Sequence, residues 1–186
     1  MSETLHADAL RVLSAWQATS EEADLCRKRT LELLAAGPMA TTRAHRPGHV
    51  TASALVVDPA GRVLLCLHGR LGLWMQLGGH CEPTDRTLAG AALREATEES
   101  GIPGLTLDPV PIDVDVHEVR CTAGDGSPAA ASVHYDVRFL VRCAAGSIEQ
   151  VSAESSALGW FEPHALPTPL ASATARQIPP ALARLR

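Results

Sequence analysis

The chain has 186 residues, of which 46% are hydrophobic and 20% are charged, the composition of an ordinary soluble globular protein. Its formal net charge is −5 and it holds no run of Lys or Arg, which argues against nucleic acid as a partner because that binding needs a basic surface. No apolar run approaches the length of a membrane span, and the N-terminus lacks the apolar region of a signal peptide.

Residues 1–46 predict two helices and no strand, placed ahead of the main domain as an accessory segment. The second helix is expected to begin at a capping box formed by Thr19 and Glu22 and to end at Gly37. A bare apolar face usually marks an interface, so we expect these helices to pack on the main domain or in a homodimer, with a substrate lid as the alternative. The apolar positions on their faces are Leu5, Leu10, Leu13, Trp16, Leu25, Leu31 and Leu34.

Residues 47–186 are expected to form the main domain, in which several strands accompany one central helix. Residues 50–57 and 62–68 predict a hairpin, because a turn signal at residues 58–61 separates two apolar runs. The other predicted features are strands at 73–77, 105–107, 112–119, 133–143 and 156–161, a loop at 121–131, a helical turn at 163–166 and a terminal helix at 171–186 broken at Pro179 and Pro180.

The helix predicted over residues 88–100 carries the chemistry. Its Glu95, Glu98 and Glu99 are three and four positions apart or adjacent, so they share one face of the helix. Three close carboxylates repel one another, and Arg94 offsets only part of their charge, so a hard divalent cation is expected among them. The alternative is a solvated surface helix rich in Glu, which the lack of alternating Lys residues disfavours.

The stretch from Gly79 to Ile102 resembles the Nudix box, in which Gly, five residues, Glu and seven residues precede Arg-Glu-aliphatic-any-Glu-Glu-any-Gly-aliphatic. The second half of the pattern matches from Arg94 onward. The first half departs twice, because Asp85 stands where the pattern has Glu and eight residues separate it from Arg94. We expect Asp85 to serve the loop and the helix start through capping, and not to bind metal.

The resemblance implies an α/β fold of α+β type, a mixed β-sheet sandwiched between helices with an N-terminal helical extension. It also implies a Mg²⁺-dependent hydrolase, with Mn²⁺ as the alternative ion, that cleaves a diphosphate linkage in a nucleoside diphosphate derivative or nucleotide. Glu98 and Glu99 would hold metal, and Glu95 would hold metal or act as the base. Arg94 would orient the carboxylates, and the backbone carbonyl of Gly78, in a Gly-Gly turn, would be a further ligand.

Two alternatives to hydrolysis stay open. The first is a non-catalytic Nudix-like domain that senses a nucleotide, and such domains usually lose box carboxylates that this chain keeps. The second is an isoprenoid diphosphate isomerase, which needs a paired Cys and Glu in a deep apolar pocket. Cys81 lies in the box loop but is poorly placed for that role.

Four residues outside the helix are candidates for substrate binding. Trp74 would stack on a base or fill the core, and His80 would donate to a phosphate. Arg70 would meet a phosphate or lie in solvent. Glu154 would bind metal or act as base, with Glu149 as the competing residue.

The remaining histidines and the cysteines carry no ligand signature in sequence. His117, His134 and Tyr135 are expected on strands, with core or sheet-surface roles, because histidines spread over distant strands do not indicate a metal site. The five cysteines are odd in number and form no CxxC pair, so neither a zinc site nor a disulfide framework is indicated. We expect free thiols in a reducing cytoplasm.

Overall fold

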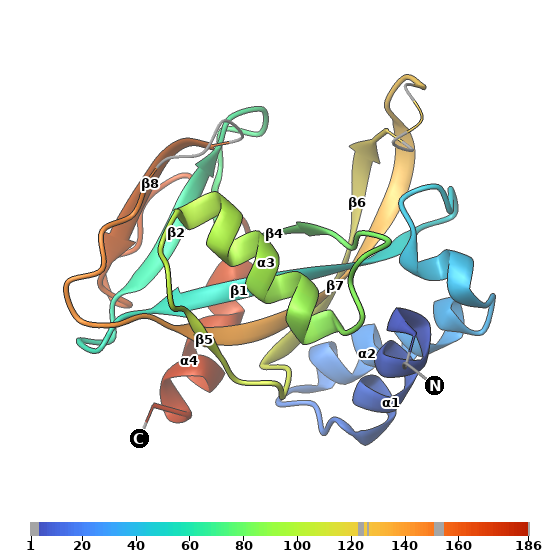
Figure 1. Cartoon of the computed structure of the whole chain (residues 1–186), viewed down its shortest axis with the longest axis horizontal. Helices are drawn as coiled ribbons and strands as arrows, with labels where there is room; N and C mark the ends of the chain where they lie inside the picture. The colour runs from blue at the N-terminus through green and yellow to red at the C-terminus, as the bar shows by residue number, and fades with distance from the viewer. Residues whose placement is uncertain (1–3, 123–124, 126, 151–154, 186) are drawn as a thin grey trace.

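The computed structural model describes residues 4–122, 125, 127–150 and 155–185. A mixed sheet of eight strands forms its centre, with the order β3-β2-β1-β7-β5 and with β4, β6 and β8 pairing β1, β7 and β2 respectively (Figure 1). β1 and β7 run parallel, and the other pairs are antiparallel. The strands are β1 (His49–Val57), β2 (Val63–His68), β3 (Trp74–Met75), β4 (Leu77–His80), β5 (Thr106–Leu107), β6 (Asp113–Cys121), β7 (Ala130–Arg142) and β8 (Ser155–Phe161).

Helices cover both faces of this sheet. The box helix α3 (Leu88–Ser100) crosses in front of β1 in Figure 1, and α4 (Thr174–Ala183) lies on the opposite side. Alternation along β1 explains both layers, because Val50, Ala52, Ala54 and Val56 belong to the core cluster that includes α3, whereas Leu55 and Val57 belong to the cluster that includes α4. The side chains that β1 places on the α4 face nearer its start are polar: His49, Thr51 and Ser53.

The N-terminal helices are α1 (Leu5–Ala15) and α2 (Glu21–Leu34), followed by a 3₁₀ turn at Pro38–Thr41. Their apolar face is covered by the same chain, since its residues join the core cluster of α3 and the sheet. The buried carboxylate of Asp8 accepts a hydrogen bond from the backbone N of Leu88 at 2.8 Å, which ties α1 to the first residue of the box helix. Leu25 remains exposed. The buried residues of this face are Leu5, Ala9, Leu13, Trp16, Ala23, Cys26 and Leu34.

Two predicted features of the chain were wrong in detail. Gly78 and Gly79 do not form a turn but lie in β4, where they pair with Ser53 and Ala52 of β1. The terminal helix continues through Pro179 and Pro180, because Ile178 and Ala181 are buried against the sheet and this packing outweighs the local helix-breaking tendency.

The remaining differences concern element ends. Ser20, not Thr19, caps α2, and its hydroxyl accepts from the backbone N of Ala23. β6 and β7 extend to Cys121 and Ala130, into the predicted loop, because their cross-strand pairing continues that far. Residues 163–166 form no helix.

Within the part of the chain that the structure describes, no helix is both long and apolar enough to cross a membrane.

Candidate active site

The box helix is fixed at both ends by its own sequence. Thr87 is its N-cap, with its hydroxyl accepting from the backbone N of Gly90 at 2.9 Å. Gly101 ends it in the left-handed conformation, with φ of 65°. The predicted capping role of Asp85 was therefore wrong for the helix. Its carboxylate accepts from the backbone N of Glu82 at 2.7 Å and so orders the loop before the helix.

Arg94 lies at the centre of the carboxylates. It donates to Asp85 at 3.0 Å, to Glu95 at 3.1 Å and to Glu98 at 3.0 Å, and also to the backbone carbonyl of His80 at 3.0 Å. Burial alone would lower the pKa of Arg94, but the hydrogen bonds and charges of Asp85 and Glu95 outweigh burial and raise it. A permanently charged guanidinium thus links the box loop to the helix and orients two of the three predicted carboxylates.

The two glycines of β4 allow the helix carboxylates to approach the backbone. Glu99 accepts from the backbone N of Gly78 at 2.8 Å. A Cβ on Gly78, whose φ is 144°, would lie 2.3 Å from the Cβ of Ser53, and one on Gly79 would lie 2.9 Å from a carboxylate oxygen of Glu95. Only glycine fits at either position without displacing these groups. The backbone of β4 therefore lies directly beside Glu95 and Glu99.

These residues fit a hard divalent cation. Arg94 lies within 4.0 Å of four carboxylates, those of Glu82, Asp85, Glu95 and Glu98, and cannot balance their charge alone. The side chain of Glu98 is 60% exposed, so it faces solvent and is accessible to an ion. The donors are all oxygens, which Mg²⁺ and Mn²⁺ prefer over nitrogen or sulfur.

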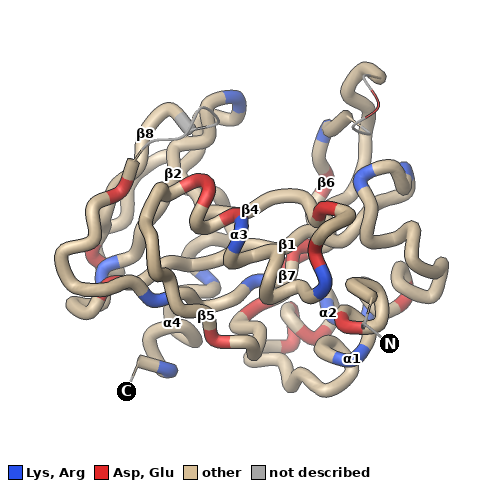
Figure 2. The backbone as a smooth tube through the Cα atoms, in the orientation of Figure 1, with Lys and Arg blue, Asp and Glu red and all other residues tan. Residues whose placement is uncertain are grey.

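A cleft of about 2360 Å³ opens beside the box helix. Glu95, Glu98, Glu99, His80 and Arg70 all line it, so the structure brings these predicted residues to one surface. Its volume exceeds that of an ordinary small-molecule pocket, about 300–1,000 Å³, and leaves room for an extended substrate. In Figure 2, acidic segments lie on α3, and basic segments lie on the loop between β2 and β3 and on the loop that precedes β1.

Trp74, a predicted substrate residue, is not among the described residues that line the cleft. Trp74 packs edge-on against Phe161 with ring centroids 4.9 Å apart and belongs to the margin of the second core cluster. Glu154 lies outside the described residues. Its competitor, Glu149, accepts a hydrogen bond from the indole of Trp160 at 2.9 Å.

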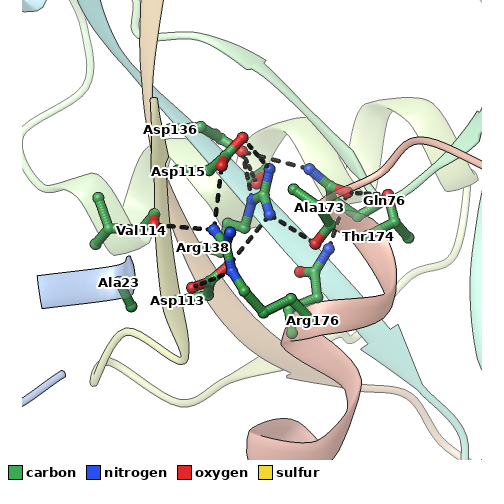
Figure 3. A network of polar contacts seen from close by, with 12 residues as sticks. Ala23, Gln76, Asp113, Val114, Asp115, Asp136, Arg138, Ala173, Thr174 and Arg176 are labelled. Atoms are coloured by element: carbon green, nitrogen blue, oxygen red, sulfur yellow. Dashed lines mark hydrogen bonds and ion pairs between the residues drawn. The ribbon is translucent and has the colours of Figure 1, made fainter. Parts of the chain in front are cut away.

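The floor of the cleft is a buried ionic network that sequence reasoning missed (Figure 3). Arg138 of β7 donates to Asp136 at 2.9 Å and to Asp113 and Asp115 of β6 at 3.1 Å. Burial would raise the pKa of Asp136, but Arg138 outweighs burial and lowers it. The missed signal was the recurrence of polar residues at every second position, in residues 113–117 and 134–138. Other side chains that contact these four residues are Thr51, Ser53, Gln76, His117 and Arg176.

The expectation that the histidines lie apart was also wrong. The ring centroids of His49, His80 and His134 are 5.0–5.1 Å from one another. Burial lowers the pKa of His80 to about 4 and that of His134 to about 3, so both are neutral near pH 7. His80 can therefore offer a neutral N–H to a phosphate, but no positive charge. The ring of His117 lies edge-on to that of His134, and its Nδ1 lies 2.9 Å from a carboxylate oxygen of Asp115.

Sequence comparison decides the family, because the family model for the NUDIX domain matches residues 47–182, well over half of the chain. The chain belongs to the Nudix family. The predicted fold, a mixed sheet flanked by helices, and the predicted class, a Nudix-type hydrolase of phosphoric anhydride bonds, are confirmed. No curated protein sequence matches this chain.

Solved structures agree with this Nudix assignment at the level of the fold. An Ap4A hydrolase from C. elegans, solved as a binary complex, has a TM-score of 0.55 at 19% identity, covering 73% of this chain and 96% of its own. A NUDIX-family hydrolase from Clostridium perfringens has a TM-score of 0.55 at 23% identity, with coverages of 75% and 99%. The NUDIX domain of Shewanella oneidensis NrtR, complexed with ADP ribose, has a TM-score of 0.51 at 22% identity, with coverages of 83% and 97%.

Proposed function

We propose that this Nudix protein is a Mg²⁺-dependent hydrolase that cleaves a diphosphate linkage in a nucleoside diphosphate derivative or nucleotide. The observation that carries the proposal is that Glu95, Glu98 and Glu99 line one large cleft, with Glu95 and Glu98 held by Arg94 and Glu99 held by the backbone N of Gly78. Two structural neighbours support a nucleotide derivative as the substrate class. One is the Ap4A hydrolase, and the other is the NrtR NUDIX domain complexed with ADP ribose.

Each residue of the box has a distinct role in this proposal. Glu98 and Glu99 hold the ion together with the backbone carbonyl of Gly78, and Glu95 holds it or acts as the general base. When bound, Mg²⁺ neutralises charge on the non-bridging phosphate oxygens and helps to ionise the attacking water. Arg94 holds Glu95 and Glu98 in position beside the cleft, because its Nη1 donates to both.

The substrate side of the cleft is polar. Arg70 lines it and supplies positive charge to a phosphate, while the neutral imidazole of His80 supplies a hydrogen bond. The edge-on contact between Trp74 and Phe161 favours the core role of Trp74 over stacking on a base. Glu154 remains the proposed additional acidic residue.

The two alternative functions have less support. A sensing domain would not need the complete carboxylate set of the box, in which Arg94 holds Glu95 and Glu98 and the backbone N of Gly78 holds Glu99. The isomerase would need a reactive Cys, but Cys81 is buried, and burial raises its pKa to about 12, so the thiol stays protonated and unreactive near pH 7.

The homodimer and the cytoplasmic location stay predictions. The apolar face of α1 and α2 is covered within the chain, which removes the main argument for a dimer through these helices. Leu25 is the large apolar side chain of α2 that remains exposed, at 59%. Light scattering on the full chain measures the oligomeric state directly, and a monomer would contradict the predicted dimer.

The test is a substrate panel with Mg²⁺: nucleoside triphosphates, nucleotide sugars, dinucleotide cofactors and CDP-alcohols, with products identified by mass spectrometry. Hydrolysis is expected to stop in EDTA and to return with excess Mg²⁺ or Mn²⁺. Glu99→Gln removes a charge at the ion and is expected to lower kcat by about 10²–10⁴-fold. Glu32→Gln, on the exposed side of α2, is the matched control. Activity that survives chelation, or Glu99→Gln within a few-fold of wild type, would refute the proposal.

A further inference from the structure

A second group of ligand-type side chains lies where four strands meet. His49 of β1, His80 of β4, His134 of β7 and Cys121 of β6 each offer one ligand atom, and these atoms all lie within 4.8 Å of one another. The strand register explains the convergence, because His49 pairs directly with His134 and His80 pairs with Thr51, two residues along β1 from His49. Residues far apart in the sequence therefore point into one small volume.

The unpaired ring nitrogens of this group point to a ligand. The Nε2 atom of each of the three histidines is buried and has no hydrogen-bond partner among the described residues. Buried polar atoms are nearly always paired, so three unpaired ring nitrogens in one cluster call for an explanation. The Nδ1 of His49 lies 3.4 Å from the backbone carbonyl of His45, which can only accept. This contact places the proton on Nδ1 and leaves the lone pair on Nε2, the arrangement found in metal-binding histidines.

The surroundings favour metal over protons at these nitrogens. Burial, with the nearby positive charge of Arg43, lowers the pKa of His49 and of His80, and burial together with the neighbouring histidines lowers the pKa of His134. Neutral imidazole is the form that binds a metal ion. The buried Cys121 has a free thiol, and its thiolate form would bring the negative charge that a divalent ion beside Arg43 requires.

We propose that His49, His80, His134 and Cys121 form a tetrahedral binding site for Zn²⁺, separate in chemistry from the Mg²⁺ ligands of the Nudix box. Three nitrogens and one sulfur are a ligand set that Zn²⁺ binds and Mg²⁺ does not. Tetrahedral Zn²⁺, with bonds of about 2.0–2.3 Å, places its ligand atoms roughly 3.3–3.6 Å apart. The separations of up to 4.8 Å therefore need to close by roughly 1 Å, which small side-chain rotations supply.

The site has a structural consequence for the box. His80 is the last residue of β4, and its backbone carbonyl accepts from Arg94 at 3.0 Å. Zn²⁺ on the imidazole of His80 would fix this strand to β1, β6 and β7. The ion would thus hold in place the backbone on which Arg94 and the carboxylates rest, without contacting the substrate.

The test uses the tag-free full-length protein, stripped with chelator and then titrated with Zn²⁺ or Co²⁺ in excess Mg²⁺. We expect about one Zn²⁺ per chain by elemental analysis, a raised Tm, and with Co²⁺ the visible spectrum of a tetrahedral ion with a thiolate charge-transfer band. Cys121→Ser is expected to remove the charge-transfer band, and His134→Ala to weaken Zn²⁺ binding by about tenfold or more.

Matched controls separate this site from its neighbours. His117→Ala changes a histidine next to His134 that is outside the cluster, and Cys143→Ser changes another buried thiol, so both should bind Zn²⁺ like wild type. Glu99→Gln should also bind Zn²⁺ normally, which distinguishes failure of this site from failure of the Nudix site. Circular dichroism establishes that each variant is folded. Less than stoichiometric binding by wild type, or unchanged binding in both Cys121→Ser and His134→Ala, would overturn the proposal.

Discussion

Replacement of Arg138 by Met tests the role of the ionic network beneath the cleft. The Arg138 side chain is 3% exposed and pairs with three carboxylates, of which Asp136 is itself almost fully buried. Removing one partner of a buried pair costs about 3–5 kcal/mol, because an uncompensated charge remains in the interior. Arg176 still pairs with Asp113 and Asp115, but no other cation contacts Asp136 in the described structure. The loss should therefore lie within that range.

For a chain of this length, each kcal/mol corresponds to about 2–4 °C, so Arg138→Met is expected to lower Tm by roughly 6–20 °C. Urea and thermal unfolding followed by circular dichroism measure the change. Lys28→Met removes an exposed partner of Asp24 and should cost less than about 1 kcal/mol. Adding Asp136→Asn to Arg138→Met should recover part of the stability, because it neutralises the unpaired charge. If Arg138→Met costs less than about 1 kcal/mol, or if the double variant is the less stable one, our account of the network is wrong.

Two further predictions concern Asp85 and acid pH. Asp85→Asn should lower kcat roughly tenfold, because it loosens Arg94, and should leave the Mg²⁺ dependence unchanged. If kcat instead falls as far as in Glu99→Gln and the Mg²⁺ dependence changes, Asp85 is a metal ligand. Burial would raise the pKa of Asp115, but the hydrogen bond from His117 and the charge of Arg138 outweigh burial and lower it. Arg138 likewise outweighs burial at Asp136 and lowers its pKa. A carboxyl whose pKa is lower in the folded than in the unfolded state stabilises the fold at pH values above its unfolded pKa of about 3.9. The urea midpoint should therefore fall as the pH drops from 5 toward 3. A midpoint that does not change over this range would contradict the prediction.

Local sequence predicted the parts of the site that local interactions build. The helix from Leu88 to Ser100 and its stop at Gly101 were predicted correctly, because propensity, carboxylate spacing and the left-handed glycine all act within one short segment. The pairing of Arg94 with Glu98 followed from helix geometry in the same way. Asp85 was placed in the loop correctly, but its partner Arg94 is nine residues away and could not be inferred from capping rules.

The parts that were missed depend on strand pairing over long distances. Whether His49 meets His134 is decided by the parallel register of β1 and β7, and nothing in either segment alone specifies that register. The same register brings Ser53 to Asp136. The Gly-Gly segment was interpreted as a turn because glycines are frequent in turns, whereas here their lack of side chains admits Ser53 and Glu95. Tertiary contacts therefore determine both the histidine cluster and the strand conformation of β4.

The central parallel pair also affects how the chain folds. Thr51 and Asp136, which hydrogen-bond at the floor of the cleft, are 85 residues apart in sequence. A contact of such sequence separation requires a large loop to close before it gains stability, which slows folding. During synthesis the box helix can form early, but the cleft has no floor until β7 has left the ribosome. Any fragment that ends before β7 therefore carries the Nudix box without a binding site to act on.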